Sequence, residues 1–298
     1  MNDPHTQKTS ISATLKYTLV RRLRPAVAAV FLGLCAQPAL ADINLIFGTY
    51  AADKPTETVR KFKPFLDHVA AGMTEILGEP VSIKMKIAKE YEESIDHLAT
   101  GAIDFSRFGP ASYITAHARN SDIQIVAMEL KKGEKRFKGV IAVHADSDIE
   151  SLQELAQRSF AFGDELSTIG RYLAQSHLIE AGVYGQDLER FEFLGRHDRV
   201  GAAVGAGNFT AGALKESTFK KMVQSGVPIK ALFKFDNVTK PWLASSNMSP
   251  EVLSAMQQVI MNTTDPEILG SIAKDGFTTG ADTDYDFVRD AMERSRMF

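Results

Sequence analysis

The sequence predicts an α/β protein made of two lobes, each containing a mostly parallel β-sheet flanked by helices. From residue 43 to the C-terminus, short apolar runs typical of strands alternate with longer segments of helical periodicity. Strands and helices that alternate in this way form parallel sheets covered on both faces. Strand-like crossings near residues 128–142 and 230–245 separate two such blocks. We therefore expect two hinge crossings and a ligand between the lobes.

Lobe 1 is expected to comprise residues 42–130 and 243–298, because the final helices return to the first block. Apolar residues at helical spacing predict one long helix over 56–77, and alternation of apolar and polar residues predicts a strand over 81–87. The other expected elements of this lobe are strands over 43–48, 103–108, 123–128 and 241–246 and helices over 91–99, 250–261, 266–274 and 284–297, with a further helix after Gly109-Pro110.

Lobe 2 is expected to comprise residues 131–242. Its predicted strands cover 139–144, 159–162, 191–194 and 227–235, its helices follow residues 151, 167 and 195, and a charged loop spans 131–136. No internal repeat or low-complexity tract interrupts this order in the sequence after residue 41.

The first 41 residues have the pattern of a secretory signal peptide. Three arginines within residues 21–24 precede an apolar run over 26–34, and Ala39-Leu40-Ala41 forms a small-x-small cleavage pattern. The run is short for a membrane span. Cys35, the only cysteine, lies in this segment; the alternative of a lipid anchor at Cys35 is disfavoured because Leu34 stands where a small residue is expected. We therefore expect a periplasmic protein.

Charge and composition exclude several classes of function. The chain is 44% hydrophobic and 24% charged, as in soluble globular proteins. Removing residues 1–41 takes five basic and one acidic side chain from totals of 34 and 37, leaving 29 and 36 and a net charge near −7. This charge disfavours nucleic acid and anionic membranes as partners. A small anion stays compatible, because local dipoles can hold it.

The segment from Ser159 to Gly182 predicts an anion-binding turn. A short buried strand ends at Gly163, and Ser167 and Thr168 stand at the start of a helix that Gly182 ends. The first N–H groups of a helix are unpaired and lie at the positive end of its dipole, so two hydroxyls there form a seat for an oxyanion. In the alternative reading, Ser167 only caps its own helix.

No pattern in the sequence predicts catalysis. The seven histidines show no metal-binding spacing, and Ser167 lacks a nucleophile-elbow glycine pattern. His197 and Asp198 are adjacent on one helix, so they point apart and do not form a triad with Ser167. We expect no catalytic residue, no metal and no cofactor.

Four pieces of the chain, taken in order, resemble a known family. They are Phe47-Gly48-Thr49-Tyr50, the run from Gly101 to Tyr113, the turn from Gly163 to Gly170, and Gly195-Arg196-His197. The sequence resembles the periplasmic substrate-binding proteins of phosphate, phosphite and phosphonate ABC transporters. The resemblance implies a two-lobed type II periplasmic binding protein fold. It also implies a small oxyanion as ligand and an ABC permease in the inner membrane as partner, and we expect a monomer.

The resemblance also implies which residues bind the ligand. In the family a Ser-Thr-Ser cluster at a helix start grips the oxyanion; Ser167 and Thr168 match its first two members, and Ile169 replaces the third. His197 approximates a family histidine, with Arg196 inserted before it. Aromatic residues of the first lobe close over the ligand, and those at fitting positions are Tyr50, Phe108 and Tyr113.

A carboxylate that accepts from a protonated ligand is implied as well, for which Glu216 is the candidate and Asp236 the alternative. Residue types alone also admit other roles, since His197 could be a helix-start histidine, and Phe108 and Tyr113 could be core residues. Two further functions remain open: a sensor subunit that feeds a membrane receptor kinase, or the same fold binding a different small anion.

Overall fold

The computed structural model describes residues 42–298 except Asp53 and Ser271. The predicted signal peptide and Cys35 lie outside the described residues. Within the described part of the chain, no helix is both long and apolar enough to cross a membrane.

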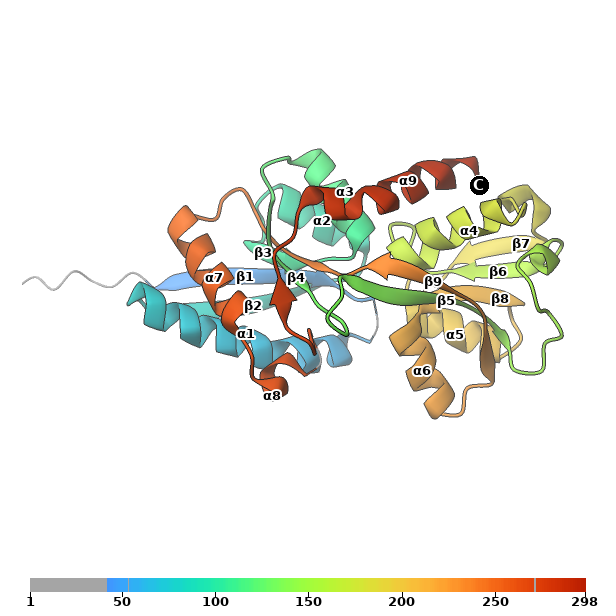
Figure 1. Cartoon of the computed structure of the whole chain (residues 1–298), viewed down its shortest axis with the longest axis horizontal. Coiled ribbons are helices and arrows are strands. Elements are labelled where there is room, and N and C mark those ends of the chain that lie inside the picture. Colours follow the sequence, from blue (N-terminus) through green and yellow to red (C-terminus); the bar gives the residue numbers. More distant parts are fainter. Residues whose placement is uncertain (1–41, 53, 271) are drawn as a thin grey trace, which may run out of the picture. The chain divides into compact units, whose positions relative to one another are not determined.

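The first sheet combines strands from both ends of the described chain (Figure 1). Its strand order is β11–β4–β10–β3–β1–β2; β1 runs parallel to β2 and β3, and β10 runs antiparallel to β3 and β4. The strands are β1 (Ile43–Tyr50), β2 (Val81–Ala88), β3 (Phe105–Arg107), β4 (Gln124–Glu129), β10 (Pro241–Ala244) and β11 (Phe277–Thr278).

Helices cover both faces of this sheet. The helices α1 (Pro55–Leu77), α7 (Pro250–Asn262) and α8 (Pro266–Leu269) pack on one face, and α2 (Tyr91–Ala99) and α3 (Pro110–Arg119) pack on the other (Figure 1). Pro55 starts α1 because proline lacks the N–H that a helix start leaves unpaired, and Gly78 ends α1 with a φ of 71°. The helix expected over residues 266–274 is shorter than predicted and ends at Leu269, before Gly270.

The second sheet contains strands from the middle of the chain in the order β7–β6–β8–β5–β9. Here β6 runs parallel to β7 and β8, whereas β5 runs antiparallel to β8 and β9. The strands are β5 (Arg136–His144), β6 (Ser159–Phe162), β7 (Arg190–Phe193), β8 (Ala211–Lys215) and β9 (Ile229–Val238). The chain passes from the first sheet to the second between β4 and β5, and returns between β9 and β10.

The helices of the second sheet also lie on both of its faces. One face carries α5 (His197–Gly205) and α6 (Glu216–Gln224), and the other carries η2 (Thr168–Leu173), a π-helical segment that continues directly into α4 (Ala174–Glu180). Short 3-10 turns, η1 (Gln153–Leu155) and η3 (Gly185–Asp187), connect these elements.

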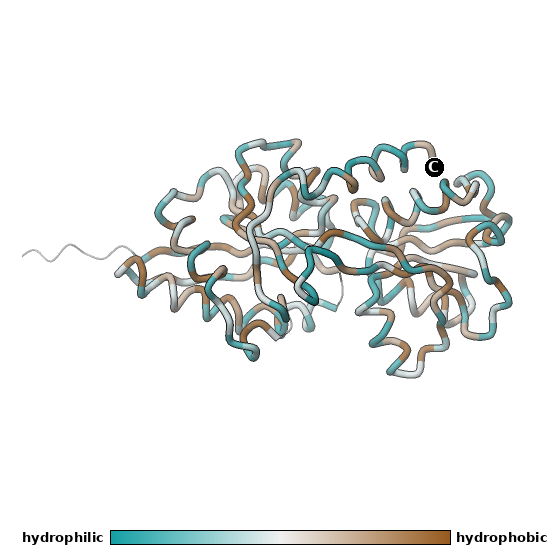
Figure 2. Tube along the Cα trace, in the orientation of Figure 1, coloured by the Kyte–Doolittle hydropathy of each residue, from teal (hydrophilic) through white to brown (hydrophobic). Residues whose placement is uncertain are grey.

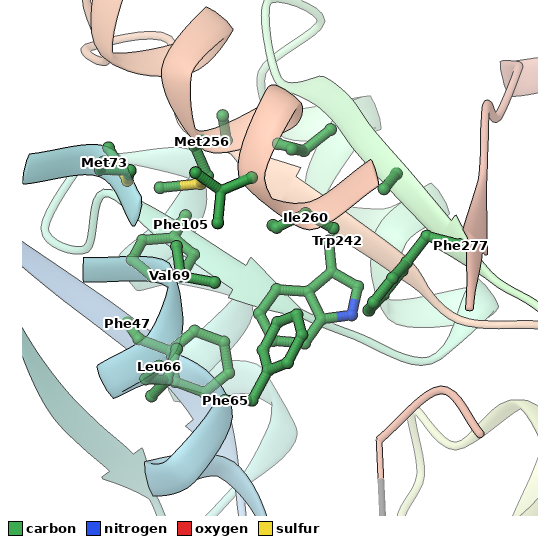
Figure 3. Close-up of a cluster of buried hydrophobic side chains, with 14 of the residues drawn as sticks. Phe47, Phe65, Leu66, Val69, Met73, Phe105, Trp242, Met256, Ile260 and Phe277 are labelled. Carbon is green, nitrogen blue, oxygen red and sulfur yellow. The ribbon is translucent and has the colours of Figure 1, made fainter. Parts of the chain in front are cut away.

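A cluster of aromatic and aliphatic side chains holds α1 and α7 against the first sheet (Figure 3). Trp242 of β10 is fully buried at its centre, with its ring centroid 5.0 Å from that of Phe65 and 5.5 Å from that of Phe47. Aromatic rings bury large apolar areas, so this cluster dominates the packing between residues that are nearly 200 positions apart in sequence.

The C-terminal segment contacts elements beside both sheets. It consists of η4 (Asp282–Tyr285), α9 (Asp286–Arg294) and η5 (Ser295–Met297), and hydrophilic residues predominate along α9 in Figure 2. Val288 joins the core cluster of α2 and α3, whereas Ala291 joins the core of the second sheet. This segment therefore packs against both halves of the chain.

Candidate functional site

A cavity of about 780 Å³ is lined by residues that belong to both sheets. The first sheet contributes the ends of β1 and β3, and the second contributes the turn after β6 and the starts of the helices after β7 and β8. In open α/β sheets, ligands bind in the crevice outside the carboxyl ends of the strands. The cavity lies at this position.

Five helices present their N-terminal residues to the cavity. These residues are Lys54 and Thr58 of α1, Gly109 and Pro110 of α3, Ser167 and Thr168 of η2, His197 and Asp198 of α5, and Ser217 and Thr218 of α6. A helix N-terminus carries roughly half a positive charge and unpaired N–H groups. The convergence of several such ends favours the binding of an anion in the cavity.

Two glycines hold the turn between β6 and η2 in place. The Gly163 N–H donates to the Gly170 carbonyl oxygen at 2.8 Å, and a Cβ on Gly170 would lie 2.8 Å from the Gly163 Cα. Only glycine at both positions permits this approach of backbone to backbone. The Ser167 hydroxyl oxygen accepts from the Gly170 N–H at 2.9 Å, so Ser167 does cap its own helix.

Capping does not exhaust the hydrogen-bonding capacity of Ser167. A hydroxyl carries one O–H donor as well as acceptor lone pairs. Because the Gly170 N–H occupies the acceptor side of Ser167, the proton of this buried hydroxyl is left to donate. Ser167 can therefore cap its helix and donate its O–H to an anion at the same time.

Thr168 links the two halves of the chain. Its hydroxyl oxygen accepts from the Ala111 N–H at 2.9 Å, in the first turn of α3. A second link joins the start of α5 to the end of β1, where the His197 N–H donates to the Ala52 carbonyl oxygen at 3.3 Å. Like Ser167, Thr168 accepts from a backbone N–H and keeps its own O–H as a donor.

Tyr50 brings a third hydroxyl to the same place. Its oxygen accepts from the Gly109 N–H at 2.7 Å and lies 3.0 Å from the Ser112 hydroxyl oxygen. Around Gly109, an added Cβ would be 3.1 Å from the Tyr50 hydroxyl oxygen and 3.4 Å from that of Thr168. The start of α3 is therefore surrounded by hydroxyls, and a side chain larger than that of glycine at position 109 would crowd the Tyr50 hydroxyl.

Burial keeps the Tyr50 hydroxyl protonated. It raises the pKa of Tyr50 to about 12, although the bonds with Ser112 and Gly109 act in the opposite direction. The ring stacks on Tyr91 at a centroid distance of 3.5 Å and on Phe108 at 5.4 Å. Tyr91 and Phe108 also line the cavity, so an aromatic wall adjoins the hydroxyl cluster.

Of the seven residues that the sequence predicts as ligand-binding, the cavity brings together Tyr50, Phe108, Ser167, Thr168 and His197. The side chain of His197 is buried at the start of α5.

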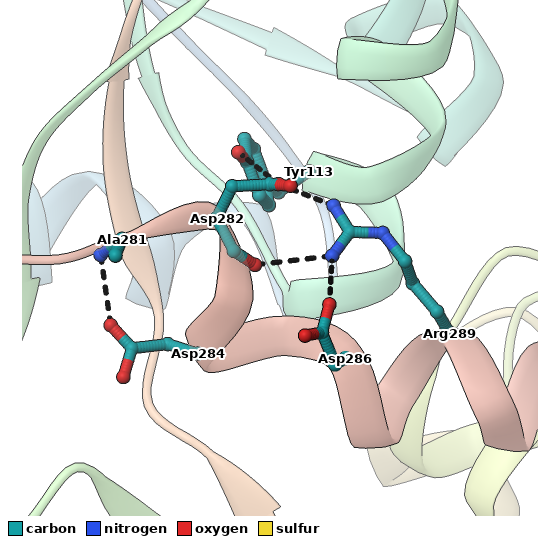
Figure 4. Close-up of polar contacts among 6 residues, drawn as sticks. All are labelled: Tyr113, Ala281, Asp282, Asp284, Asp286 and Arg289. Atoms are coloured by element: carbon teal, nitrogen blue, oxygen red, sulfur yellow. Dashed lines mark hydrogen bonds and ion pairs between the residues drawn. The ribbon is translucent and has the colours of Figure 1, made fainter.

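Tyr113 is not among the described residues that line this cavity. Its ring is buried against Tyr285, and its hydroxyl donates to the Asp282 carboxylate at 2.7 Å (Figure 4). Arg289 also contacts Asp282 and bonds to Asp286 at 2.7 Å. Tyr113 thus attaches α3 to the C-terminal segment.

Glu216, the candidate carboxylate, is also absent from the described lining of the cavity. Its side chain pairs with Lys220 at 3.1 Å and with Lys234 at 3.7 Å. Burial alone would raise its pKa, but these two lysines hold the pKa of Glu216 below its usual value. The alternative, Asp236, pairs with Lys138 at 2.7 Å and is largely exposed.

The cavity contains cationic residues that the sequence reasoning missed, among them Arg107 and Lys240. Arg107 bonds to the buried carboxylate of Glu129 through two nitrogens, at 2.5 and 2.7 Å. Burial would raise the pKa of Glu129, but Arg107, with Lys240 and Lys61, holds that pKa below its usual value. Burial acts oppositely on Lys240 and, together with the charges of Arg107 and Lys215, lowers its pKa well below the ordinary value.

Asn237 is a further polar residue of the cavity. Its side chain is fully buried, and among the described residues neither its Nδ2 nor its Oδ1 atom has a hydrogen-bond partner. Buried polar groups in proteins are nearly always paired, so an unpaired amide that faces a cavity indicates a site for a polar ligand. The signal available in the sequence was a polar residue near the end of a predicted strand, which is too common to be specific.

No group of three His, Cys, Asp or Glu side chains within the described part of the chain is arranged to hold a metal ion. The donors that the cavity presents are hydroxyls, N–H groups and cations, which suit an anionic ligand rather than a metal.

Comparisons with known proteins agree with this geometry. A family model described as "ABC transporter, phosphonate, periplasmic substrate-binding protein" matches residues 47–285. The probable ABC transporter phosphite binding protein PhnD1 of Prochlorococcus marinus (strain MIT 9301) is 28% identical over 167 residues, which make up 50% of this chain and 54% of that protein. The chain thus matches about half the length of this curated relative.

Solved structures show the same fold. The structure of PhnD1 from Prochlorococcus marinus in complex with methylphosphonate superposes with a TM-score of 0.75 at 20% identity, covering 86% of this chain and 99% of the other. A binding protein component of an ABC phosphonate transporter from Pseudomonas aeruginosa has a TM-score of 0.74 at 17% identity, covering 85% and 87%. These similarities confirm the predicted type II periplasmic binding protein fold.

Proposed function

Because the chain belongs to the family of periplasmic substrate-binding proteins of phosphonate ABC transporters, we propose that it captures a phosphonate, phosphite or phosphate anion in the cavity between its two sheets. It then delivers this ligand to an ABC permease in the inner membrane. The observation that carries the proposal is the convergence of five helix N-termini and several hydroxyl donors on one cavity.

The oxyanion is held at the turn after β6. Ser167 and Thr168 donate their O–H groups, because a backbone N–H already occupies the acceptor side of each hydroxyl. Tyr50 and His197 donate from the two sides of the cavity, and Phe108 forms part of its aromatic wall. These O–H and N–H donors hold the oxyanion without a buried lysine in direct contact with it.

Binding is coupled to movement of two lobes, residues 42–130 with 243–298 and residues 131–242. Two of the contacts that line the cavity already bridge the halves, from Thr168 to Ala111 and from His197 to Ala52. An anion between them adds further bridging bonds and so favours the closed arrangement, which the permease recognises. The protein acts as a monomer in the periplasm after removal of residues 1–41, and it does not transform its ligand.

Titration calorimetry against phosphate, phosphite, methylphosphonate and sulfate tests this proposal. We expect at least one of the phosphorus oxyanions to bind, and sulfate to bind more weakly than that ligand. If all four fail while aliphatic or aromatic carboxylates bind, the proposed ligand class is wrong. Release of phosphate or alcohol from a bound ester would contradict the absence of catalysis.

A further inference from the structure

Charged side chains are distributed unevenly between the cavity and the rest of the chain. Of the described residues that line the cavity, seven are Lys or Arg and two are Asp or Glu, whereas the whole chain has 34 basic and 37 acidic side chains. Both of these acids are paired: Glu57 lies 3.4 Å from Lys221, and Asp198 lies 3.0 Å from Arg196. The cavity therefore favours ligands with more negative charge and disfavours a cationic tail.

The size of the cavity agrees with a larger ligand. Its volume of about 780 Å³ lies within the range of roughly 300–1,000 Å³ that is usual for pockets of drug-sized molecules. Phosphite or methylphosphonate, with only a handful of heavy atoms, would occupy a small part of this space.

The positive residues do not all gather at the Ser167–Thr168 turn. Asn237 near the end of β9 and Lys240 just before β10 lie where the chain crosses between the sheets, and Arg107 at the end of β3 lies beside this crossing. We name them the hinge cluster. Strand pairing brings them together, because Trp242 lies opposite Arg107 and the Glu129 N–H donates to the Lys240 carbonyl oxygen at 3.2 Å.

Arg107 of the hinge cluster and the hydroxyl cluster contact helices on opposite faces of the first sheet. The Arg107 guanidinium lies 5.6 Å from the ring of Phe62, which belongs to α1. Thr168 and Tyr50, in contrast, bond to the start of α3, and α3 packs on the other face. A ligand that touches both clusters must extend across the edge of the sheet.

The hinge cluster has unused capacity for an acidic group. In the part of the chain that the structure describes, the buried amide of Asn237 has no hydrogen-bond partner. On the neighbouring strand, Phe137 pairs in register with Asn237, and the Lys240 ammonium lies 4.5 Å from the Phe137 ring. Glu129 pairs with Arg107, and the ammonium form of Lys240, which burial and the charges of Arg107 and Lys215 disfavour, adds a second positive charge beside this carboxylate. One further negative group would balance this charge and satisfy the amide N–H.

On the basis of the function proposed above, we propose that the hinge cluster binds a second acidic group of the ligand. The cavity would then select organic anions that carry a phosphonate at one end, held by Ser167 and Thr168, and a carboxylate or second phosphate at the other, held by Asn237 and Lys240. A phosphonate with an aminoalkyl tail would bind poorly, because its ammonium group would meet Lys240 and Arg107.

Titration calorimetry with methylphosphonate, phosphonoacetate, 3-phosphonopropionate and 2-aminoethylphosphonate tests this inference. We expect one of the two phosphonocarboxylates to bind at least tenfold more tightly than methylphosphonate, and 2-aminoethylphosphonate to bind more weakly than methylphosphonate. Lys240→Met should remove most of the tenfold advantage, because it should weaken binding of the phosphonocarboxylate far more than binding of methylphosphonate. The matched control is Lys234→Met. Lys234 lies on β9, is half-exposed and is not among the described residues that line the cavity, so this variant should still bind the phosphonocarboxylate more tightly than methylphosphonate.

The outcomes separate this inference from the proposed function. If methylphosphonate binds and neither phosphonocarboxylate binds more tightly, the second subsite is refuted and the proposed function stands. The same holds if Lys240→Met weakens all phosphonates equally, since the hinge cluster would then be part of the first subsite. If no phosphonate, phosphite or phosphate binds, both proposals fail. Methylphosphonate binding by Lys240→Met also shows that the variant is folded.

Discussion

The hydroxyl oxygen of Thr168 accepts a hydrogen bond of 2.9 Å from the backbone N–H of Ala111. This bond joins the start of η2, on the second sheet, to the start of α3, on the first. The positive ends of two helices therefore face the same cavity, and the orientation of this hydroxyl leaves its proton available to an anion.

Replacing Thr168 by Val tests the role of this hydroxyl. The variant keeps the shape of the side chain but loses both the bond to Ala111 and the donor to the ligand. A hydrogen bond to a charged group contributes about 1.5–3 kcal/mol, so we expect the dissociation constant for the preferred phosphorus oxyanion to rise at least tenfold in calorimetry. Thr168→Ser, which retains the hydroxyl, should bind within a few fold of the unaltered protein; equal affinity of all three proteins would place the ligand elsewhere.

Gly170→Ala should disrupt the turn itself. The added Cβ would lie 2.8 Å from the Gly163 Cα and 2.9 Å from the Ser167 hydroxyl oxygen, so β6 and η2 would have to separate. Forced overpacking destabilises by about 1–3 kcal/mol, and we expect a loss of this size in chemical denaturation together with weaker ligand binding. Gly182→Asn is the control, because Gly182 is left-handed with open space around it and asparagine tolerates that conformation.

Tyr113→Phe should leave ligand affinity unchanged, because the Tyr113 hydroxyl bonds to Asp282 rather than facing the cavity. The free energy of unfolding should fall by about 1 kcal/mol for the lost hydrogen bond, while Arg289 still holds Asp282. Tyr50→Phe is the matched comparison and should lower ligand affinity. A large loss of ligand affinity in Tyr113→Phe would show that the Tyr113 hydroxyl does contribute to ligand binding.

The raised pKa of Asp164 should make the free energy of unfolding depend on pH. Burial raises the pKa of Asp164 to about 6, even though the Leu166 N–H donates to its carboxylate at 2.8 Å. This value exceeds that of an unfolded chain, about 4, so the stabilising contribution of the protonated group is complete below pH 4 and is lost as the pH rises through 6. Asp164→Asn keeps the acceptor oxygen and stays neutral.

We therefore expect Asp164→Asn to raise the free energy of unfolding at pH 7.5 by about 1–2 kcal/mol, a value that allows for the partial exposure of the side chain. Denaturation curves between pH 4 and 7.5 should show a weaker pH dependence than those of the unaltered protein. Glu165→Gln, at the exposed neighbouring position, should change the profile much less, because the Glu165 charge only adds to burial in raising the pKa of Asp164. An unaltered profile in Asp164→Asn would show that this carboxyl titrates normally.

Arg107→Met should strongly destabilise the first sheet. Glu129 is buried and its charge is balanced mainly by Arg107, so removal of the guanidinium leaves a buried carboxylate without its closest partner. Breaking such a pair costs about 3–5 kcal/mol. The double variant Arg107→Met with Glu129→Gln should recover part of this loss in denaturation experiments; a single variant as stable as the unaltered protein would contradict this account of the pair.

Local sequence patterns predicted most of the secondary structure, and together with the family resemblance they predicted five of the cavity residues. Ser167 and Thr168 follow a strand and a glycine, and this pattern by itself predicts a helix start with hydroxyl donors. The strand before them, β6, covers the predicted residues. The prediction could not foresee that this helix begins as a π-helix, in which the Tyr172 N–H donates to the Ser167 carbonyl oxygen five residues earlier at 3.2 Å.

The sequence by itself determined the alternation of strands and helices, and with it a sheet edge at which helix N-termini converge, because hydrophobic periodicity and helix-start signals act over a few residues. Only the tertiary structure decided which side chains share the cavity. Tyr113 lies outside the cavity because its hydroxyl bonds to Asp282, which is 169 positions away in the sequence. The cavity is lined by Arg107, Asn237 and Lys240 because β3, β9 and β10 pair with strands that are distant in the sequence. Such partners are selected by long-range packing, which no local pattern encodes.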